Sequence, residues 1–436
     1  MQAELVALEC TDEHRERWRD IGAAAAGLPS GAGRLDQLLR LAVAEVPFYA
    51  ALRLERPDAE PPSLTEFPIL RKADLRQHFA DLIRRDPIDS SLPHDRFYVV
   101  RTSGSTGRPV STLKSAGEDG RADAVLRERL YREHRVPERG EIFDVGLHAY
   151  DAPLVEPRID SRPWLAWNLR PYEPDRAEVE AEYDIVVRRR EPVLVHGVAS
   201  RIVTLARLAR DEGLPMRPRL AVCSYEQLTE SARSLIEAAF GCPAVSMYGT
   251  SETGIAGWEC RERRIHFEPD AVVHEVVDEG GSPVEPGDAG HLLLTSLKGT
   301  VMPLIRYDTG DRAQRPLDRC PCGKDAPSIT ALEGRSGLLL VGRSGRTQPP
   351  YLLMSLVDEL GVEDFQLVQD APGTVRLIVP ADAPVPPALT DRLVAGLRER
   401  NRDDLDISVE LTGSFVLSSS GKRETIVSRI GPEAAR

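Results

Sequence analysis

The sequence predicts an α/β protein with a large N-terminal domain at residues 1–335 and a small C-terminal α+β domain at residues 336–436. Three observations support this prediction. Strand-like apolar runs alternate with helical patterns from about residue 97 to 300, which favours parallel β-α-β units. A β-rich section follows at 271–315. After Gly334-Arg335 the pattern changes to a short strand, a helix, a hairpin and a second helix, so we place the domain boundary near residue 335.

The elements are expected in the following order. Residues 12–58 should be helical, because their apolar side chains recur at helical spacing. Pro61-Pro62 interrupts this pattern, and short helices continue over 64–83. The expected strands of the α/β region are 97–100, 142–146, 192–196, 220–223 and 244–247, with helices at 199–212 and 229–240. Later elements are strands at 272–277, 291–296 and 338–341, a turn at 280–290, a helix near 351–360, a hairpin over 365–379 and a helix at 390–400.

Composition and charge exclude several classes of function. The net charge of −13 argues against general nucleic-acid binding, which needs a basic surface. No run approaches the 18 or so apolar residues of a membrane span. The first ten residues carry acids where a signal peptide would carry basic residues, so we expect a cytoplasmic protein without a membrane partner.

The run from Arg101 to Val110 concentrates glycines and hydroxyls directly after an expected strand. The glycines allow backbone conformations in which several N–H groups converge on one anion, and the hydroxyls add donors, which suits a polyphosphate. No Gly-Lys-Ser/Thr follows at P-loop spacing, and an ordinary Ser/Gly-rich surface turn remains the alternative. The candidate phosphate-binding residues are Thr102, Ser103, Gly104, Ser105, Thr106 and Gly107.

A second cluster, Tyr248, Gly249, Thr250 and Glu252, follows the expected strand at 244–247. Ligands of open α/β sheets bind at the carboxyl ends of strands, and a carboxylate there could hold Mg²⁺, which prefers oxygen ligands. The alternative is a strand-to-helix turn with Glu252 near a helix start.

Two further candidates are Asp311 and Lys422. Asp311 ends the run Ile305-Arg-Tyr-Asp-Thr-Gly-Asp, in which two acids flanking a tight turn could accept hydrogen bonds from ribose hydroxyls. A plain β-turn would have the same composition. Lys422 lies in the Ser/Gly-rich segment 418–423, where a solvated surface lysine is the alternative.

Three cysteines and one histidine form a candidate metal site. Cys260 and His266 are separated by five residues, and Cys320-x-Cys322 follows later in the chain. Three thiolates and an imidazole suit tetrahedral zinc, and four protein ligands imply a closed structural site. The alternative is free buried thiols with a surface histidine.

Taken together, the order, spacing and domain placement of these clusters resemble the superfamily of adenylate-forming enzymes that includes acyl-CoA synthetases, and most closely its phenylacetate–CoA ligase branch. The resemblance spans nearly the whole chain, and it implies a mobile C-terminal domain. It also implies that the loop 102–109 closes over the ATP phosphates and that Tyr248, Gly249 and Thr250 line the nucleotide site.

The resemblance assigns roles to individual residues as well. Ser224, Tyr225 and Glu226 stand where the family usually has Gly-Ala-Glu against adenine. Glu252 corresponds to the acid that helps hold Mg²⁺, and Asp311 to the acid that binds the ribose, assisted by Arg335 at the domain junction. Lys422 corresponds to the lysine that reaches the carboxylate and the α-phosphate. Phenylacetate–CoA ligase-like proteins also carry a Cys/His set similar to the candidate zinc site.

The implied reaction converts a carboxylic acid and ATP into acyl-AMP and pyrophosphate, after which the acyl group passes to CoA. An aromatic acid is expected, because aromatic and small residues occur around the expected acyl pocket. His148, Tyr150 or His196 could meet a polar ring substituent near Gly249. The alternative for at least one of these histidines is a core residue satisfied by the protein.

The identity of the acyl acceptor is open. Gly337 stands where the family has a hinge aspartate, and Ser344 where CoA-forming members have a glycine lining the thiol tunnel. A carrier protein or another small nucleophile is therefore an alternative to CoA, and a catalytically inactive nucleotide-binding or zinc-stabilised regulatory protein is a second alternative. The chain could also form a homodimer.

Overall fold

The computed structural model of the chain describes the following residues: 6–7, 31–50, 63–85, 97–101, 110–115, 117–137, 140–145, 154–157, 163–167, 192–211, 213, 216–335, 340–344, 347–348, 353–354, 356–357, 360, 362, 365–381, 388–399, 404–412, 414–416 and 426–430. Within this part of the chain, no helix combines the length and apolar character needed to cross a membrane.

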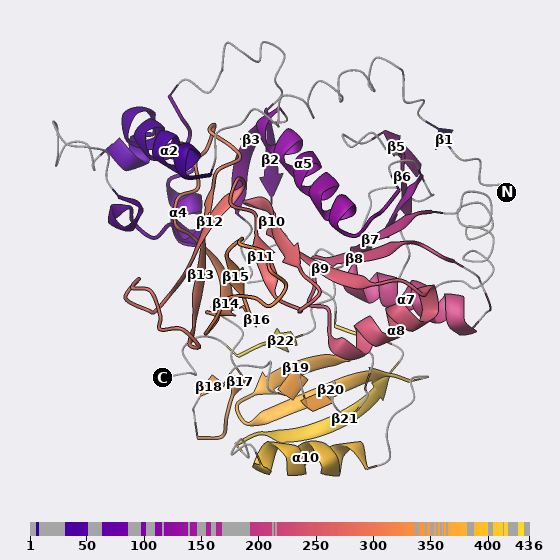
Figure 1. The fold of residues 1–436 in the computed structure, drawn as a ribbon. Coiled ribbons are helices and arrows are strands. Elements are labelled where there is room, and N and C mark those ends of the chain that lie inside the picture. Colours follow the sequence, from indigo (N-terminus) through magenta and orange to yellow (C-terminus); the bar gives the residue numbers. More distant parts are fainter. Residues whose placement is uncertain are drawn as a thin grey trace.

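A large mixed sheet forms the centre of the N-terminal domain (Figure 1). Its four central strands are parallel neighbours, and they match the four strands expected from the apolar runs after residue 140: β4 (Ile142–Val145), β7 (Leu194–Val198), β8 (Leu220–Ser224) and β9 (Ala244–Thr250). β4, β7 and β8 are buried along their whole length, which explains why they read as continuous apolar runs.

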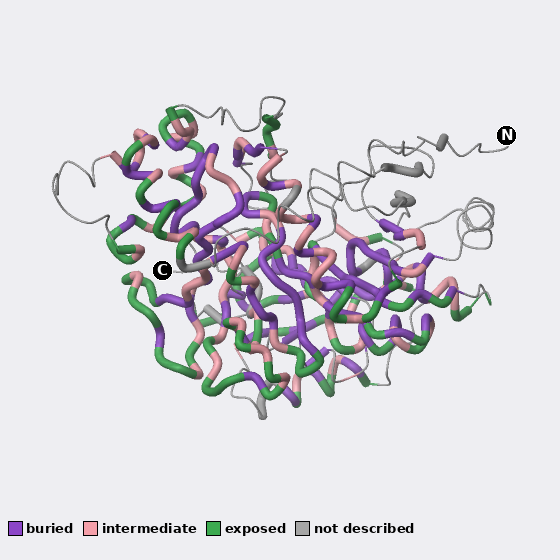
Figure 2. Tube along the Cα trace, turned by 45° about the horizontal axis from the view of Figure 1, so that its top comes forward, coloured by how far each residue is buried: buried purple, intermediate pink, exposed green. Residues whose placement is uncertain are grey.

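Helices cover both faces of these parallel strands (Figure 1). α7 (Ala199–Asp211) and α8 (Glu230–Phe240) share one hydrophobic cluster with Val195 and Ala221, whereas α5 (Glu118–Glu133) shares another with Leu194 and Leu220. Successive strand residues point to opposite faces, so the two clusters lie on opposite sides of the sheet. Figure 2 shows the buried strands running through the molecule, with exposed residues on loops and outer helix faces.

The sheet continues on both sides with strands that the sequence did not predict. On one side are β6 (Pro163–Trp167), β5 (Leu154–Pro157) and β1 (Val6–Ala7). On the other side are the antiparallel strands β10 (Gly254–Glu259), β11 (Ile265–Phe267) and β15 (Ser328–Ile329). These strands are short, and their pairing partners define them more than their own composition does.

A second, antiparallel sheet packs beside the first and carries the β-rich section that was expected at 271–315. Its strands are β12 (Val272–Val277), β13 (Ala289–Ser296), β14 (Tyr307–Gln314) and β16 (Ala331–Arg335). The run expected as the first strand of the α/β region instead forms a separate two-stranded ribbon of β2 (Phe97–Arg101) and β3 (Ser111–Ser115).

The structure describes part of the expected N-terminal helical segment, residues 31–50. α2 spans Gly31–Glu45, and a 3₁₀ turn at Pro47–Tyr49 follows it, because a proline cannot continue the helical hydrogen bonding. The remainder of 12–58 lies outside the described residues. The short helices expected over 64–83 are a 3₁₀ turn at Leu64–Glu66 and α4 (Lys72–Gln77).

The residues after 335 form a hydrophobic cluster of their own, from Leu340 to Ile426, below the large domain in Figure 1. A direct contact joins the two parts, because the Ser231 hydroxyl on α8 donates to the Val362 carbonyl over 3.4 Å. The expected hairpin and final helix are present. The elements are β17 (Leu340–Val341), β18 (Thr347–Gln348), β19 (Gln366–Ala371), β20 (Thr374–Pro380), α10 (Leu389–Glu399), β21 (Asp406–Thr412) and β22 (Ile426–Ser428).

Candidate active site

Two segments with the same pattern, a tyrosine followed four residues later by an acid, meet where the two sheets adjoin. They are Tyr248 to Glu252 at the end of β9 and Tyr307 to Asp311 in β14. The segments exchange hydrogen bonds. The Tyr248 hydroxyl donates to Asp311 Oδ2 over 2.8 Å, and the Tyr307 hydroxyl donates to Glu252 Oε1 over 2.6 Å. Each predicted acid is thus held by the tyrosine of the other segment.

Burial and the neighbouring carboxylates keep both phenols protonated. Burial raises the pKa of Tyr248, and Asp311 raises it further. Burial also raises the pKa of Tyr307, with Glu252 adding to the shift. A hydrogen bond to a charged acceptor contributes about 1.5–3 kcal/mol, so the two pairs fix the acids in position before any ligand arrives.

Glu252 lies in the turn of a β-hairpin, and β10 follows the turn directly. The alternative of a strand-to-helix turn is therefore wrong. The hairpin requires glycine at 249, because a Cβ there would lie 2.5 Å from the Gly254 carbonyl oxygen. Thr250 Oγ1 accepts a hydrogen bond from the Thr253 N–H over 3.0 Å and stabilises the turn. Glu252 itself is buried, with 7% of its surface exposed.

Asp311 lies within the strand β14, so the expected tight turn at 308–311 is also wrong. The pairing of β13 with β14 shifts register near this point, and Gly310 has a φ of +79°. This irregularity resembles a bulge, which gives the strand the local composition of a turn. Asp311 is the direct backbone partner of Arg335 across β14 and β16, and their shared role at the ribose stays a prediction.

The predicted adenine segment begins at the carboxyl end of β8. Ser224 is buried, whereas Tyr225 is 67% exposed and has a φ of +69°, a conformation that residues with a β-carbon rarely adopt. Tyr225 and His196 face each other edge to face, with ring centroids 6.4 Å apart. Backbone strain of this kind is concentrated at binding and catalytic sites.

His196 connects this segment to the neighbouring strand. Its Nε2 lies 3.2 Å from Ser224 Oγ, and its Nδ1 lies 3.3 Å from Asp144 Oδ1, with all three residues buried. A neutral ring that donates through Nδ1 to the carboxylate can accept from the serine at Nε2. The arrangement is that of a histidine satisfied by the protein. It gives His196 a role in holding Ser224, and its contact with a substrate stays a prediction.

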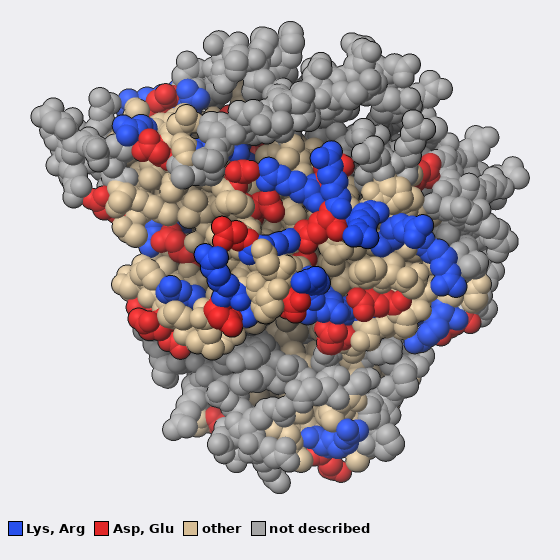
Figure 3. All heavy atoms as spheres, in the orientation of Figure 1, with Lys and Arg blue, Asp and Glu red and all other residues tan. Residues whose placement is uncertain are grey.

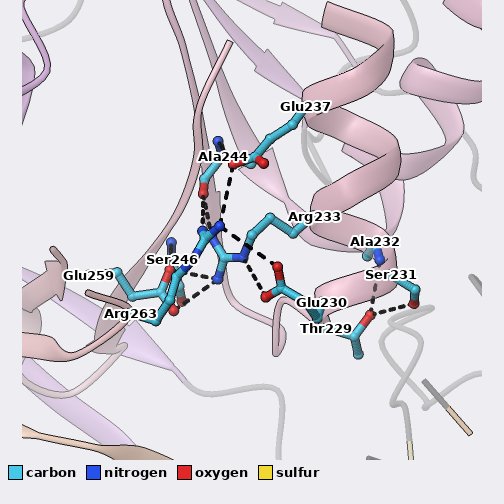
Figure 4. A network of polar contacts seen from close by, with 10 residues as sticks. All are labelled: Thr229, Glu230, Ser231, Ala232, Arg233, Glu237, Ala244, Ser246, Glu259 and Arg263. Carbon is cyan, nitrogen blue, oxygen red and sulfur yellow. Dashed lines mark hydrogen bonds and ion pairs between the residues drawn. The ribbon is translucent and has the colours of Figure 1, made fainter. Parts of the chain in front are cut away.

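A buried arginine network anchors the helix that follows the adenine segment (Figure 4). Arg233 on α8 donates to both Glu259 carboxylate oxygens over 2.9 and 2.8 Å, and it also donates to the Ala244 carbonyl. The same Glu259 accepts from the Ser246 N–H over 2.8 Å. The network therefore joins α8, β9 and β10. Removing one partner of a buried ion pair typically costs 3–5 kcal/mol, so this network fixes the base of the Glu252 hairpin.

The cysteine and histidine cluster comes together as the spacing predicted. The ligand atoms of Cys260, His266, Cys320 and Cys322 all lie within 4.8 Å of one another. His266 Nδ1 lies 2.9 Å from the Ala326 carbonyl, which leaves Nε2 directed toward Cys322 Sγ at 3.4 Å. Burial lowers the pKa of His266, so the ring is neutral and able to ligate a metal. The cluster joins β10, β11 and the loop before β15.

Several predicted residues lie outside the described part of the chain. They are Thr102, Ser103, Gly104, Ser105, Thr106, Gly107, His148, Tyr150, Gly337 and Lys422. Their roles stay predictions, as does the side-chain role of Arg335.

Three residues that the sequence did not single out lie at the site. Tyr307 pairs with Glu252, while Thr112 and Lys114 line a cavity that Glu252 also lines. The spacing of four residues between tyrosine and acid, which occurs in both segments, could have indicated Tyr307. Side chains alternate between the two faces of a strand, so the sequence could have placed Thr112 and Lys114 on one face of the strand that follows 102–109.

On the face seen in Figure 3, basic side chains form a band along the right side of the described surface. Elsewhere on this face, lysine and arginine are interspersed with acids across its described part.

Comparisons with known proteins agree with this geometry. No family model matches the chain. The chain is 26% identical over 364 residues to a phenylacetate–coenzyme A ligase of Thermus thermophilus, covering 78% of each chain, and 26% identical over 346 residues to one of Pseudomonas putida, covering 73% of each. Its fold matches a crystal structure of 2-hydroxyisobutyryl-CoA ligase in complex with an acyl-AMP, with a TM-score of 0.69 and 18% identity, over 100% of this chain and 96% of the other. The chain is thus similar in sequence to phenylacetate–coenzyme A ligases and shares the fold of 2-hydroxyisobutyryl-CoA ligase, in agreement with the resemblance that the motifs indicate.

Proposed function

We propose that this protein is an AMP-forming acid–CoA ligase, which activates a carboxylic acid with ATP as acyl-AMP and then transfers the acyl group to CoA. The observation that carries the proposal is the crossed pair of tyrosine–acid hydrogen bonds, Tyr248 with Asp311 and Tyr307 with Glu252. It brings the two acids expected to serve ATP into one rigid unit beside the Ser224–Glu226 segment.

The residues of this unit have separate tasks. Asp311 would accept hydrogen bonds from the ribose hydroxyls, since a carboxylate has acceptor capacity beyond the one bond from Tyr248. Glu252 would hold Mg²⁺, because its carboxylate oxygens and the nearby Ser296 hydroxyl suit that hard cation. Bound Mg²⁺ would neutralise the charge on the phosphates. Catalysis by this chain would then consist mainly of positioning and charge stabilisation.

The substrate proposed is an aromatic acid. The support is the sequence similarity to proteins named phenylacetate–coenzyme A ligase and the exposed Tyr225 ring beside the carboxyl ends of β7 and β8. A flat acid could stack against that ring. His196 would act on this pocket indirectly, by fixing Ser224 below Tyr225.

The two domains are proposed to divide the reaction between them, with residues 1–335 binding the substrates and Lys422 of the small domain reaching the carboxylate and the α-phosphate. CoA is the proposed acceptor. A carrier protein is the second candidate, because Ser344 replaces the tunnel glycine and its hydroxyl, which glycine lacks, donates to Asp404.

We also propose that Cys260, His266, Cys320 and Cys322 hold structural zinc. The donor set suits zinc and leaves no open coordination position for catalysis. Purified protein should contain one zinc per chain, and Cys320→Ser should lose the metal and melt at lower temperature. Full stability together with absence of metal in the parent protein would contradict this.

The experiment that tests the function is a two-part assay with ATP, Mg²⁺ and a panel of benzoic, phenylacetic, cinnamic and amino-substituted aryl acids. Acid-dependent exchange of pyrophosphate into ATP is expected, followed by acyl-CoA when CoA is added. Exchange without acyl-CoA would shift the assignment to another acceptor. Absence of exchange with every acid would favour an inactive nucleotide-binding protein.

A further inference from the structure

A small polar cavity lies beside β3 of the β2–β3 ribbon. β3 is the strand that follows residues 102–109 in the sequence. The polar lining of the cavity comes from Thr112 and Lys114 of β3, Asp119, Glu252 and Ser296. The free volume is about 10 Å³, which accommodates a single water molecule or one oxygen atom of a larger ligand. None of the candidate motifs in the sequence includes Thr112, Lys114 or Asp119.

Thr112 and Lys114 are two residues apart on one strand, so their side chains lie on the same face. Thr112 is 2% exposed and Lys114 is 7% exposed. Within the described residues, the Thr112 hydroxyl has no hydrogen-bond partner. A buried polar group left unpaired costs about 1–3 kcal/mol, so this hydroxyl is a group that a ligand would complete.

The two lysines nearest the cavity differ in how they are paired. Lys298 Nζ lies 2.7 Å from Asp123 Oδ1 and 2.7 Å from the Ile255 carbonyl, so its charge is fully engaged. Lys114 has no carboxylate at ion-pair distance in the described part of the chain. Burial lowers the pKa of Lys114 and raises that of Asp119, and the attraction between the two charges offsets these shifts only in part.

The charges of the cavity select the kind of ligand. A lone anion would meet the Asp119 and Glu252 carboxylates, and a lone cation would meet the Lys114 ammonium. One oxygen atom of a phosphate that carries Mg²⁺ fits both the volume and the charges, because that oxygen would accept from Lys114 and Thr112 while Glu252 would serve as a ligand of the metal.

We propose that Lys114 and Thr112 bind a terminal phosphate oxygen of ATP and then hold the pyrophosphate that leaves after adenylation. This inference rests on the proposed function, and it adds two binding residues to it. Lys114 would supply a charged hydrogen bond to that phosphate oxygen, in addition to the charge that Mg²⁺ would supply.

Direct binding provides the first test. Calorimetric titration of the full-length protein with inorganic pyrophosphate, in EDTA and then with Mg²⁺, should show weaker binding in Lys114→Met by at least about tenfold, the worth of one charged hydrogen bond. Thr112→Val should bind severalfold more weakly and still fold. Arg376→Met, which removes one cation from the surface of the small domain, is the matched control and should bind as the parent does.

Separating the half-reactions provides the second test. Lys114→Met should raise the KM for pyrophosphate and ATP in the exchange reaction by at least about tenfold, whereas thioester formation from supplied acyl-AMP and CoA should stay within about twofold of the parent. Unchanged pyrophosphate binding in both variants would overturn the inference, as would equal losses in both half-reactions. If the parent shows no acid-dependent exchange, the proposed function fails, and the calorimetry still decides whether the cavity binds phosphate.

Discussion

The tyrosine–acid pairs and the Lys114 cavity share Glu252 yet differ in how their buried polar groups are satisfied. In the pairs, each carboxylate accepts a hydrogen bond from a tyrosine of the opposite segment. In the cavity, the Thr112 hydroxyl has no partner within the described residues, and burial depresses the pKa of Lys114. The difference indicates that the fold supplies hydrogen-bond partners to the groups that must be positioned before a ligand binds. Groups that the ligand itself would bind are left without such partners among the described residues.

Glu252 belongs to both regions, so its replacement should have the largest effect. Glu252→Gln keeps the shape and one acceptor for Tyr307 but removes the charge. We expect pyrophosphate exchange to fall by about 100-fold or more, because a preorganised charge at the phosphates is lost. Rates measured at saturating and limiting Mg²⁺ should show a higher Mg²⁺ requirement. Wild-type exchange with an unchanged Mg²⁺ dependence would remove Glu252 from the mechanism.

Tyr307→Phe tests the paired region by itself. Removal of the phenol leaves a buried carboxylate without its donor, so the free energy of unfolding should fall by about 1–3 kcal/mol. Chemical denaturation measures this directly. A variant as stable as the parent would mean that the pair contributes nothing to the preorganisation of Glu252.

Thr112→Val tests the unpaired region in the same assay and should give the opposite result. The hydroxyl makes no hydrogen bond among the described residues, so its replacement by a methyl group of similar size should leave the unfolding free energy unchanged or slightly higher. A loss as large as that of Tyr307→Phe would show that the hydroxyl is already satisfied in the protein, and the comparison would fail.

His274 provides a control outside both regions. Its ring stacks on Phe267 with centroids 4.3 Å apart, and burial lowers its pKa to about 4. The unfolded chain takes up a proton near pH 6.5 and the folded chain does not, so stability is complete above that pH and decreases from about pH 6.5 down to pH 4. The loss should be at most about 3 kcal/mol, and it should be smaller in His274→Phe. Equal pH dependence in both proteins would contradict this.

Much of the fold could be predicted from the sequence, because its central strands are buried on both faces. β4, β7 and β8 therefore appear as continuous apolar runs, and α7 and α8 have clear amphipathic patterns. The hairpin from β9 to β10 was missed, since β10 and β11 are short strands that exist through their antiparallel partners. The strand around Gly310 was predicted as a turn, because its irregular pairing with β13 gives it the local composition of a turn.

The candidate site was predictable where a motif concentrates the chemistry and unpredictable where it depends on tertiary pairing. The acids Glu252 and Asp311 stood out by composition, and the Cys/His cluster by spacing. Tyr248 and Tyr307 each donate to the acid of the other segment, across 63 and 55 residues of sequence, and the repeated tyrosine–acid spacing marks the two segments without showing that they meet. Lys114 became visible only through the cavity that it shares with Glu252.

The central claim is that this site adenylates a carboxylic acid. Acid-dependent exchange of labelled pyrophosphate into ATP, measured with the full-length protein and the aryl acid panel, tests it most directly. We expect exchange with at least one aryl acid, dependent on Mg²⁺ and reduced by about 100-fold in Glu252→Gln. Protein that binds ATP and pyrophosphate but catalyses no exchange with any acid would contradict the claim.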